Sequence, residues 1–293
     1  MSWQAYLGLY VILGFVVARF LQKKAADSVE KDKLLVHQFL FSAILAFGFF
    51  LYAGGSFDQL WHPLVPAVMG LGVLNGAANH FHWKALRISL SKTSVLTQFD
   101  DISAIALSFV FLGEFRLLRE PRLLLGMGLC FGSAWLFIKT RQEITALHNR
   151  ALLTNVLSYS LLWGTTSCAM RALALAGLPI ITFLVVWYSV SLLTVGVIMA
   201  LTNRGWPGLR VPLNEALWAY GAGIAIFVCM ALMYTVRAIA PVTVTQPIIL
   251  VSEMIIPFAI GWYAFREGKA FSIVEKLAVL VGFAGGLVLA FAY

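Results

Sequence analysis

Long apolar runs follow one another along the whole chain, separated by short stretches that carry charges, glycine or proline. A helix needs roughly 20 apolar residues to cross the hydrocarbon core of a bilayer. The runs that meet this length are residues 2–21, 34–54, 64–86, 92–112, 121–140, 151–174, 179–201, 214–238, 242–264 and 271–292. The pattern therefore predicts an all-α integral membrane protein with about ten transmembrane helices.

The two halves of the chain carry matching features. A shift of 153 residues lays the second half on the first without a gap and places Asp100 on Glu253. The first predicted repeat is 1–141 and the second is 150–293, and a polar link joins them. Each repeat has five predicted helices, and because five is odd, the second repeat must enter the membrane upside down. Inverted repeats are common in secondary transporters, whose substrate site lies between the halves near the bilayer midplane.

Composition leads to the same environment. Of the 293 residues, 61% are apolar and 12% are charged, and the mean hydropathy is +0.88. Soluble domains are nearer half apolar and a quarter charged, and a domain of this size has too little interior to hide so much apolar surface from water. We therefore expect a multi-pass protein of a cell membrane, the inner membrane if the source is bacterial.

The net charge of +8 does not indicate a nucleic-acid partner, because the basic residues lie between apolar segments, where they control topology. Most of them, including Arg19 at the end of the first predicted helix, fall on the side opposite to the termini. The positive-inside rule then places both termini outside the cell. The cysteines have no metal-ligand spacing and are interpreted as small packed residues; they are Cys130, Cys168 and Cys229. No cofactor is expected.

Two short motifs stand at corresponding places, and a third occurs once. The sequence FLGE ends the fourth predicted helix at 111–114, FREG ends the ninth at 265–268, and LLWG lies in the sixth at 161–164. The glycines after the first two motifs most simply allow close helix contact; they are Gly126, Gly128, Gly132, Gly282, Gly285 and Gly286. Together with ten helices in two repeats, these motifs resemble the EamA-type members of the drug/metabolite transporter superfamily over essentially the whole chain.

The resemblance implies alternating access around a central cavity, with the fifth and tenth helices at the periphery. It also implies small-metabolite or drug substrates, often exported, and termini inside the cell, in contrast to the charge distribution. The motif FREG departs from the family's Leu-Gly-Glu pattern. A local cap or a surface pair explains Glu114 and Glu267, and a role at an end gate is the alternative.

Three carboxylates lie near the middle of predicted membrane helices. Asp100 and Asp101 fall in the fourth helix and Glu253 in the ninth. Charged groups inside a bilayer are costly and tend to face a cavity or a partner. Such a carboxylate can release a proton when a cationic substrate arrives, which would couple transport to protons. The alternative is a buried ion pair with Arg171 or Arg237 that fixes helix packing.

Helical spacing separates the roles of these acids. Adjacent residues point about 100° apart, so Asp100 and Asp101 cannot both face the same site squarely. Asp101 shares a polar face with Gln98 and is expected to line the cavity, with Asp100 as its support or ion-pair partner. On the ninth helix, Gln246 lies on the same face as Glu253.

Further polar residues mark the third predicted helix. Asn75, Asn79 and His82 are spaced four and three apart and lie on one face. His82 titrates near neutral pH and suits a cavity, although a histidine with a local partner near a helix end is equally compatible. His80 and His82 diverge on the helix, and no Glu or Cys completes a ligand set by spacing, so no metal site is expected.

The second half contributes Trp163, Trp187 and Arg171 to the candidate site. Aromatic rings beside carboxylates suit an amine-bearing ligand through cation–π contact, and ordinary packing is the alternative. Arg171 is expected either to pair with an acid or to bind an anionic substrate group.

These observations favour a secondary transporter, a permease or exporter, that moves a small metabolite, amino acid or amine-bearing compound across the cell membrane. The expected partners are a small-molecule substrate, the lipid bilayer and protons, and a homo-oligomer is left open. No phosphate-binding loop of the Walker type occurs, so ATP-driven transport by this chain alone is not expected. An enzyme is not expected, because the acids lie too deep for a headgroup reaction. The alternative functions are a flippase for a lipid-linked intermediate and an assembly partner without turnover.

Overall fold

The computed structural model describes residues 2–140, 150–202, 208–267 and 272–293, and within these ranges all regular secondary structure is helical. The link 141–149 between the predicted repeats lies outside the described residues. The long helices are α1 (Trp3–Val11), continued by the π-helical turn η1 (Ile12–Ala18) and α2 (Arg19–Ala26), then α3 (Lys31–Tyr52), α4 (Val65–Ile88), α5 (Leu90–Leu96), α6 (Gln98–Phe111), α7 (Pro121–Thr140), α8 (Arg150–Leu175), α9 (Ile180–Thr202), α10 (Leu213–Ile239), α11 (Val242–Phe265) and α12 (Ile273–Ala292). Two short 3-10 helices, η2 (Phe57–Trp61) and η3 (Glu114–Arg119), lie between the long ones.

Each predicted membrane segment coincides with one helix or with consecutive helices, and the ends differ by a few residues. Within the described ranges, seven helical segments are long and apolar enough to cross a membrane. They are Trp3–Ala26, Lys31–Tyr52, Leu90–Phe111, Ile180–Thr202, Leu213–Ile239, Val242–Phe265 and Ile273–Ala292. The structure thus confirms an α-helical protein with several helices suited to a membrane.

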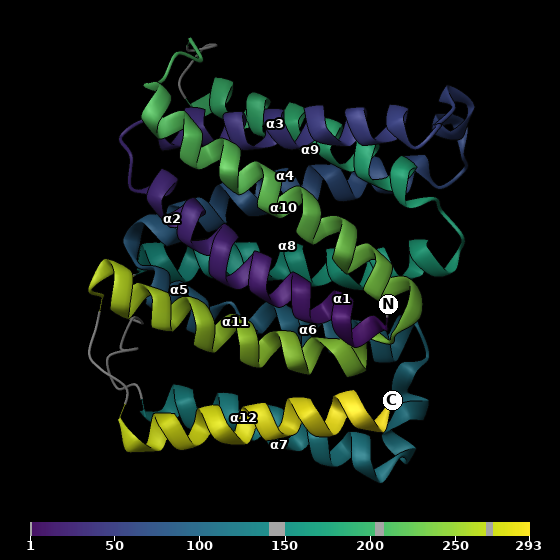
Figure 1. The fold of residues 1–293 in the computed structure, drawn as a ribbon, viewed down its shortest axis with the longest axis vertical. Coiled ribbons are helices and arrows are strands. Elements are labelled where there is room, and N and C mark those ends of the chain that lie inside the picture. The colour runs from purple at the N-terminus through teal and green to yellow at the C-terminus, as the bar shows by residue number, and fades with distance from the viewer. Residues whose placement is uncertain (1, 141–149, 203–207, 268–271) are drawn as a thin grey trace.

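The helices lie side by side in a stack (Figure 1). Helices α3 and α9 form one end of the stack, and α7 packed on α12 forms the other. Between them, α4 packs on α8 and α9, α10 packs on α3 and on α1 to α2, and α11 packs on α5 and α6. Both termini lie at the same side of the bundle. The peripheral place of α7 and α12 agrees with the expectation for the fifth and tenth helices.

Small residues allow α7 and α12 to approach each other. A Cβ atom on Gly285 would lie 2.9 Å from the Cys130 backbone nitrogen, and one on Gly126 would lie 2.7 Å from Leu289. The close-contact interpretation was wrong for Gly128 and Gly132, since a Cβ there would meet nothing within 4 Å. Both lie on the exposed face of α7, away from α12.

Apolar and polar side chains are distributed as lipid requires. Large apolar side chains are exposed on the outer faces of several helices, for example Val110, Leu193, Leu201, Phe283 and Phe291. Asp100, Asp101 and Arg237 are buried inside the bundle. Because charged groups avoid hydrocarbon unless a cavity or partner receives them, the interior is where a functional site is expected.

Candidate functional site

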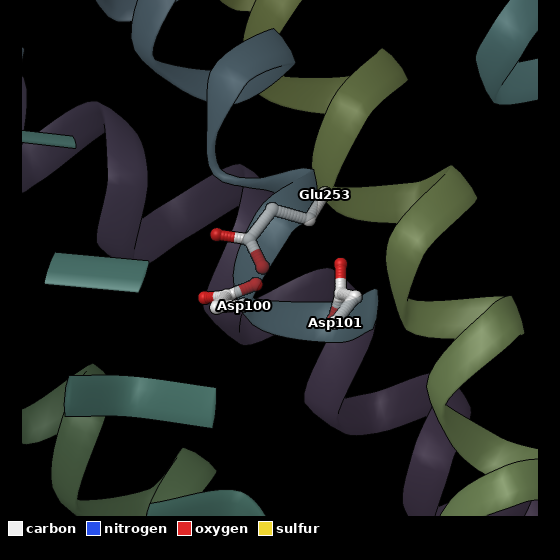
Figure 2. A group of neighbouring side chains, drawn as sticks. All are labelled: Asp100, Asp101 and Glu253. Atoms are coloured by element: carbon white, nitrogen blue, oxygen red, sulfur yellow. The ribbon is translucent and has the colours of Figure 1, made fainter. Parts of the chain in front are cut away.

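The three membrane carboxylates come together in the interior. Asp100 and Asp101 lie in the first turn of α6 and Glu253 lies in α11. One carboxylate oxygen of each lies within 4.8 Å of the others, and all three side chains are buried. Figure 2 shows the Asp100 and Glu253 carboxylates facing each other, with Asp101 beside them. The repeat alignment placed Asp100 on Glu253, and the fold places them in contact range.

Both helices that carry these acids are irregular at this point. Between α5 and α6 the Asp100 N–H donates to the Thr97 carbonyl, three residues earlier, at 2.9 Å, so the helix tightens there. Helix α11 contains Pro247 and Pro257. Because proline has no N–H, Pro257 leaves the backbone carbonyl of Glu253 without its helical donor. Such interruptions often mark functional sites in membrane helices.

Arg19 completes the cluster from the first helix. It follows the π-helical turn η1, a kind of turn that often occurs at functional sites. Its guanidinium forms an ion pair with Glu253 and donates to the His82 imidazole, with Nε2 at 2.7 Å. The side chains of Arg19 and Glu253 are only 12% and 5% exposed. Arg19 was interpreted as a topology charge at a helix end, and this was wrong: its side chain lies inside the bundle.

A second chain of contacts starts at Asp101. The Gln246 amide donates to one Asp101 oxygen and accepts a hydrogen bond from Arg237, which also donates to Thr245. Arg237 is fully buried. Within the described ranges no ion pair joins Arg171 or Arg237 directly to Asp100 or Asp101, so the guanidinium of Arg237 reaches Asp101 only through an amide.

Arg171 lies elsewhere. It donates to the Arg237 carbonyl, and its Nε is 3.6 Å from Glu114 Oε1. Of the two roles expected for Arg171, the structure therefore gives pairing with an acid. Gln98 is buried and donates to the Ser94 carbonyl of its own helix at 3.1 Å, so it is not brought to the cavity described next.

A cavity of about 80 Å³ lies beside Glu253. Its walls include Arg19, Asn75, Asn79, Trp163, Trp187 and Glu253. The expectation that Asp101 lines the cavity was wrong, because of the three carboxylates only Glu253 forms part of its wall. The volume holds a few water molecules and is smaller than the roughly 300–1,000 Å³ of typical ligand pockets. A ligand larger than a few water molecules would therefore fit only if the surrounding helices moved apart.

Aromatic rings form one wall of this cavity. Tyr159 stacks on His82 with ring centroids 4.6 Å apart and on Trp163 at 6.2 Å, and Trp163 meets the edge of Trp187 at 6.2 Å. The structure thus brings Trp163 and Trp187 beside Glu253. Asn75 and Asn79 also line the cavity; Asn79 donates to Asn75, and Asn75 donates to Ser191, each at 2.8 Å.

Sequence reasoning missed Arg19, Gln22, Tyr10 and Tyr159, which all line the cavity. Arg19 offered a signal, because it lies within the predicted span 2–21, where a charge is costly. Tyr159 lies four residues before Trp163 and so on the same helix face. The signals for Tyr10 and Gln22 are weaker, since a tyrosine within an apolar span commonly packs and Gln22 follows the end of the predicted span 2–21.

Glu114 and Glu267, which the shift of 153 residues aligns, make similar contacts at the starts of two other helices. Glu114 accepts hydrogen bonds from the backbone N–H groups of Val242 and Thr243, at 3.1 and 2.9 Å, where α11 begins. Glu267 accepts from the Ser91 N–H and the Ser89 hydroxyl, both at 2.9 Å, where α5 begins.

A basic residue accompanies each glutamate. Arg171 lies beside Glu114 at the start of α11, and the Lys23 Nζ lies 3.1 Å from Glu267 at the start of α5. The same Lys23 also donates to the Leu86 carbonyl near the end of α4, at 2.9 Å. The glutamates are therefore caps of distant helices, which the interpretation as local caps did not foresee.

Comparison with known proteins identifies the fold and no family. No protein-family model matches the sequence, and no curated protein matches it. Solved structures do match, 27 chains in all. One of them, a crystal structure described only as that of a protein, superposes with a TM-score of 0.72 over 99% of this chain and 96% of its own, at 16% identity. At this identity the likeness shows a shared fold alone.

Proposed function

We propose that this protein is a secondary transporter, of the EamA type in the drug/metabolite transporter superfamily, that moves a small metabolite, amino acid or amine-bearing compound across a membrane by alternating access. One observation carries the proposal. The Arg19–Glu253 ion pair lies in the wall of an aromatic-lined cavity, inside a bundle whose outer surface is apolar. A buried charge pair beside a cavity is costly for packing alone, and it offers both signs of charge to a solute.

The contacts between helices support two inverted five-helix repeats and ten spans. Under the shift of 153 residues, α4 corresponds to α10, α8 to the helix α1 to α2, and α9 to α3. The contacts of α4 with α8 and α9 then correspond to those of α10 with α1 to α2 and α3, and both sets occur. Helices α5 and α6 pack on their counterpart α11, and α7 packs on α12. This is the pattern that a two-fold relation between halves would give.

The mechanism starts from competition for Glu253. A protonated amine in the cavity would take the place of Arg19 at the carboxylate and lie against Trp163 and Tyr159 through cation–π contact. The freed guanidinium could then bind an acidic group of the same solute. Entry of a cation at the Glu253 carboxylate would favour loss of a proton from a protonated Asp101 carboxyl to solvent, which gives proton-coupled exchange that depends on both Asp101 and Glu253.

The lipid flippase remains the alternative. It requires basic side chains in a groove that can receive a phosphate. Arg171 and Arg237 already contact Glu114 and Gln246 in the interior. The flippase therefore has less support than a transporter of soluble solutes.

Proteoliposomes of the purified protein with an internal pH dye would test the proposal. Amino acids, aromatic amines and phosphorylated sugars are added in turn, to the wild type, Glu253→Gln and the control Glu120→Gln, whose side chain is exposed. We expect one solute class to move protons in the wild type and the control and to lose at least tenfold in rate in Glu253→Gln. Labelled solute that crosses equally in all three proteins would contradict the coupling mechanism. Absence of any solute or proton movement would contradict transport and favour the flippase.

A further inference from the structure

We infer that Asp100, Asp101 and Glu253 form a binding site for one monovalent hard cation, with Na⁺ as the ion of choice. Binding of the ion requires only the cluster and does not depend on the proposed function. The role of the ion as the coupling ion of transport does rest on that function.

The aspartates lack hydrogen-bond donors. Neither carboxylate oxygen of Asp100, and only one of the two of Asp101, lies in hydrogen-bonding geometry with a donor of the described chain. Asp100 is 1% exposed and Asp101 0% exposed, so bulk water does not solvate them. A buried polar group without a partner costs free energy, more so when it is charged. Figure 2 shows the Asp100 carboxylate directed at that of Glu253, so an ion between them would meet both.

The charges around the cluster do not balance. Two guanidinium groups lie near the three carboxyl groups. Arg19 forms an ion pair with Glu253, and Arg237 is linked to Asp101 through the Gln246 amide. His82 adds no charge, because it accepts a hydrogen bond from Arg19 and this requires a neutral imidazole. With all three carboxyl groups ionised, one positive charge is therefore missing in the described surroundings. A proton on one aspartate or a single monovalent ion supplies this charge, so the two would compete for the cluster, whereas a divalent ion would exceed it.

The spacing and kind of the oxygens suit a hard cation. Oxygens within 4.8 Å of one another fit around one ion, because hard cations bind oxygen at about 2.3–2.6 Å, half that separation. Carboxylates without nitrogen or sulfur ligands select hard ions over transition metals.

The site shares Glu253 with Arg19. An ion that draws the Glu253 carboxylate toward Asp100 weakens its ion pair with Arg19, which lines the substrate cavity. Ion binding and substrate binding would thus be linked through one side chain.

The test uses the purified full-length protein in detergent at constant pH and constant ionic strength. Thermal unfolding is followed by intrinsic fluorescence while choline is replaced by Na⁺, Li⁺, K⁺ or, in separate samples, Ca²⁺. We expect Na⁺ to raise the melting temperature saturably, by roughly 5 °C when the ion is in large excess over its dissociation constant. Asp100→Asn should lose this shift, and Glu120→Gln should keep it.

If Asp100→Asn fails to fold, binding of radioactive ²²Na⁺ to the wild type, with unlabelled Li⁺, K⁺ and Ca²⁺ as competitors, gives the answer without a variant. Equal shifts with every monovalent ion, a stronger effect of Ca²⁺, or an unchanged Na⁺ response in Asp100→Asn would overturn the inference. Substrate transport that depends on protons and not on Na⁺ would overturn the role of Na⁺ as the coupling ion and leave the proposed function standing. Specific Na⁺ binding without transport of any solute would support the ion site and contradict the proposed function.

Discussion

Arg19 joins two sides of the candidate site, because its guanidinium contacts Glu253 on α11 and His82 on α4. Removing one partner of a buried ion pair leaves an uncompensated charge, which costs about 3–5 kcal/mol. The two partners differ in their surroundings, however. Arg19 is the cation that pairs directly with the carboxylate cluster, whereas Glu253 is one of three acids in it.

We therefore predict an asymmetry between two substitutions. Arg19→Gln leaves three acids without their paired cation and should destabilise the protein by about 3 kcal/mol or more. Glu253→Gln also relieves repulsion with Asp100 and Asp101, so its cost should be clearly smaller. Reversible unfolding in mixed micelles, with Glu120→Gln as the surface control, measures both. Equal losses would mean that repulsion within the acid cluster is negligible.

The aromatic wall leads to a second prediction. Trp163→Leu should raise the KM or Kd of an amine-bearing substrate by about tenfold, because a desolvated cation–π contact is worth about 1–2 kcal/mol. The maximum rate should change less. The control is Trp135→Leu, since Trp135 is exposed on α7 and lies outside the cavity. A loss of the same size in both variants would assign Trp163 to packing.

The residues differed in how far the sequence revealed them. Asp100, Asp101 and Glu253 stood out because a charge inside an apolar run is costly and therefore informative. Arg19 was missed because a basic residue near a span end is ordinarily a topology signal. The contacts of Tyr159 depend on how α8 packs on α4, and one sequence does not fix that packing.

At the scale of elements, the carboxylates of Glu114 and Glu267 hold the first turns of α11 and α5. The first N–H groups of a helix have no partner within the helix, and a carboxylate there also interacts favourably with the helix dipole. Each contact joins the end of one membrane segment to the start of another. The two contacts are similar, but Glu114 accepts from two backbone N–H groups and Glu267 from one N–H group and one hydroxyl, and the basic neighbour is Arg171 in one case and Lys23 in the other.

We predict that Glu114→Gln increases hydrogen exchange at Val242 and Thr243 and leaves the start of α5 unchanged. Glu267→Gln should increase exchange at Ser91 and leave α11 unchanged, so each variant is the control of the other. The expected loss is about 1–2 kcal/mol of local opening free energy, the range for helix caps, or about 5- to 30-fold faster exchange. Mass spectrometry of peptic peptides measures it. Faster exchange at both helices in either variant would indicate a general loss of stability.

Apolar runs predicted the elements well because the thickness of the bilayer sets the minimum length of a span. Two internal features could not be predicted from the length of these runs. The π-helical turn at Ile12–Ala18 and the tightened turn at Thr97 depend on contacts between helices, and no proline marks either of them. The interruption of α11 was visible in advance only through Pro247 and Pro257.

At the scale of the whole molecule, the number of crossings and the side of the termini are linked. An even number of crossings puts both termini on one side of the membrane, and an odd number puts them on opposite sides. Both termini lie at one side of the bundle, and the turn between α2 and α3 lies at the other (Figure 1). Ten crossings agree with this arrangement. Seven segments in the described ranges qualify by apolar length alone, and seven crossings would not agree with it.

Single cysteines in a cysteine-free variant would decide the topology. Replacing the native cysteines with alanine is expected to be tolerated, since none has a disulfide partner; they are Cys130, Cys168 and Cys229. The new cysteines are Ser2→Cys, Val29→Cys, Asp58→Cys and Tyr293→Cys, all at exposed positions. A membrane-impermeant maleimide is applied to intact cells and to inverted vesicles.

We expect Ser2→Cys, Asp58→Cys and Tyr293→Cys to react from one side and Val29→Cys to react from the other. Labelling of the two termini from opposite sides would exclude ten crossings and, with them, two inverted five-helix repeats. The same labels decide the orientation. Termini that react in intact cells would agree with the positive-inside rule, whereas termini that react only in inverted vesicles would agree with the resemblance to EamA-type transporters. Because the Arg19 side chain lies in the candidate site, its charge should not be counted in the positive-inside rule. The remaining basic residues must then explain the observed orientation.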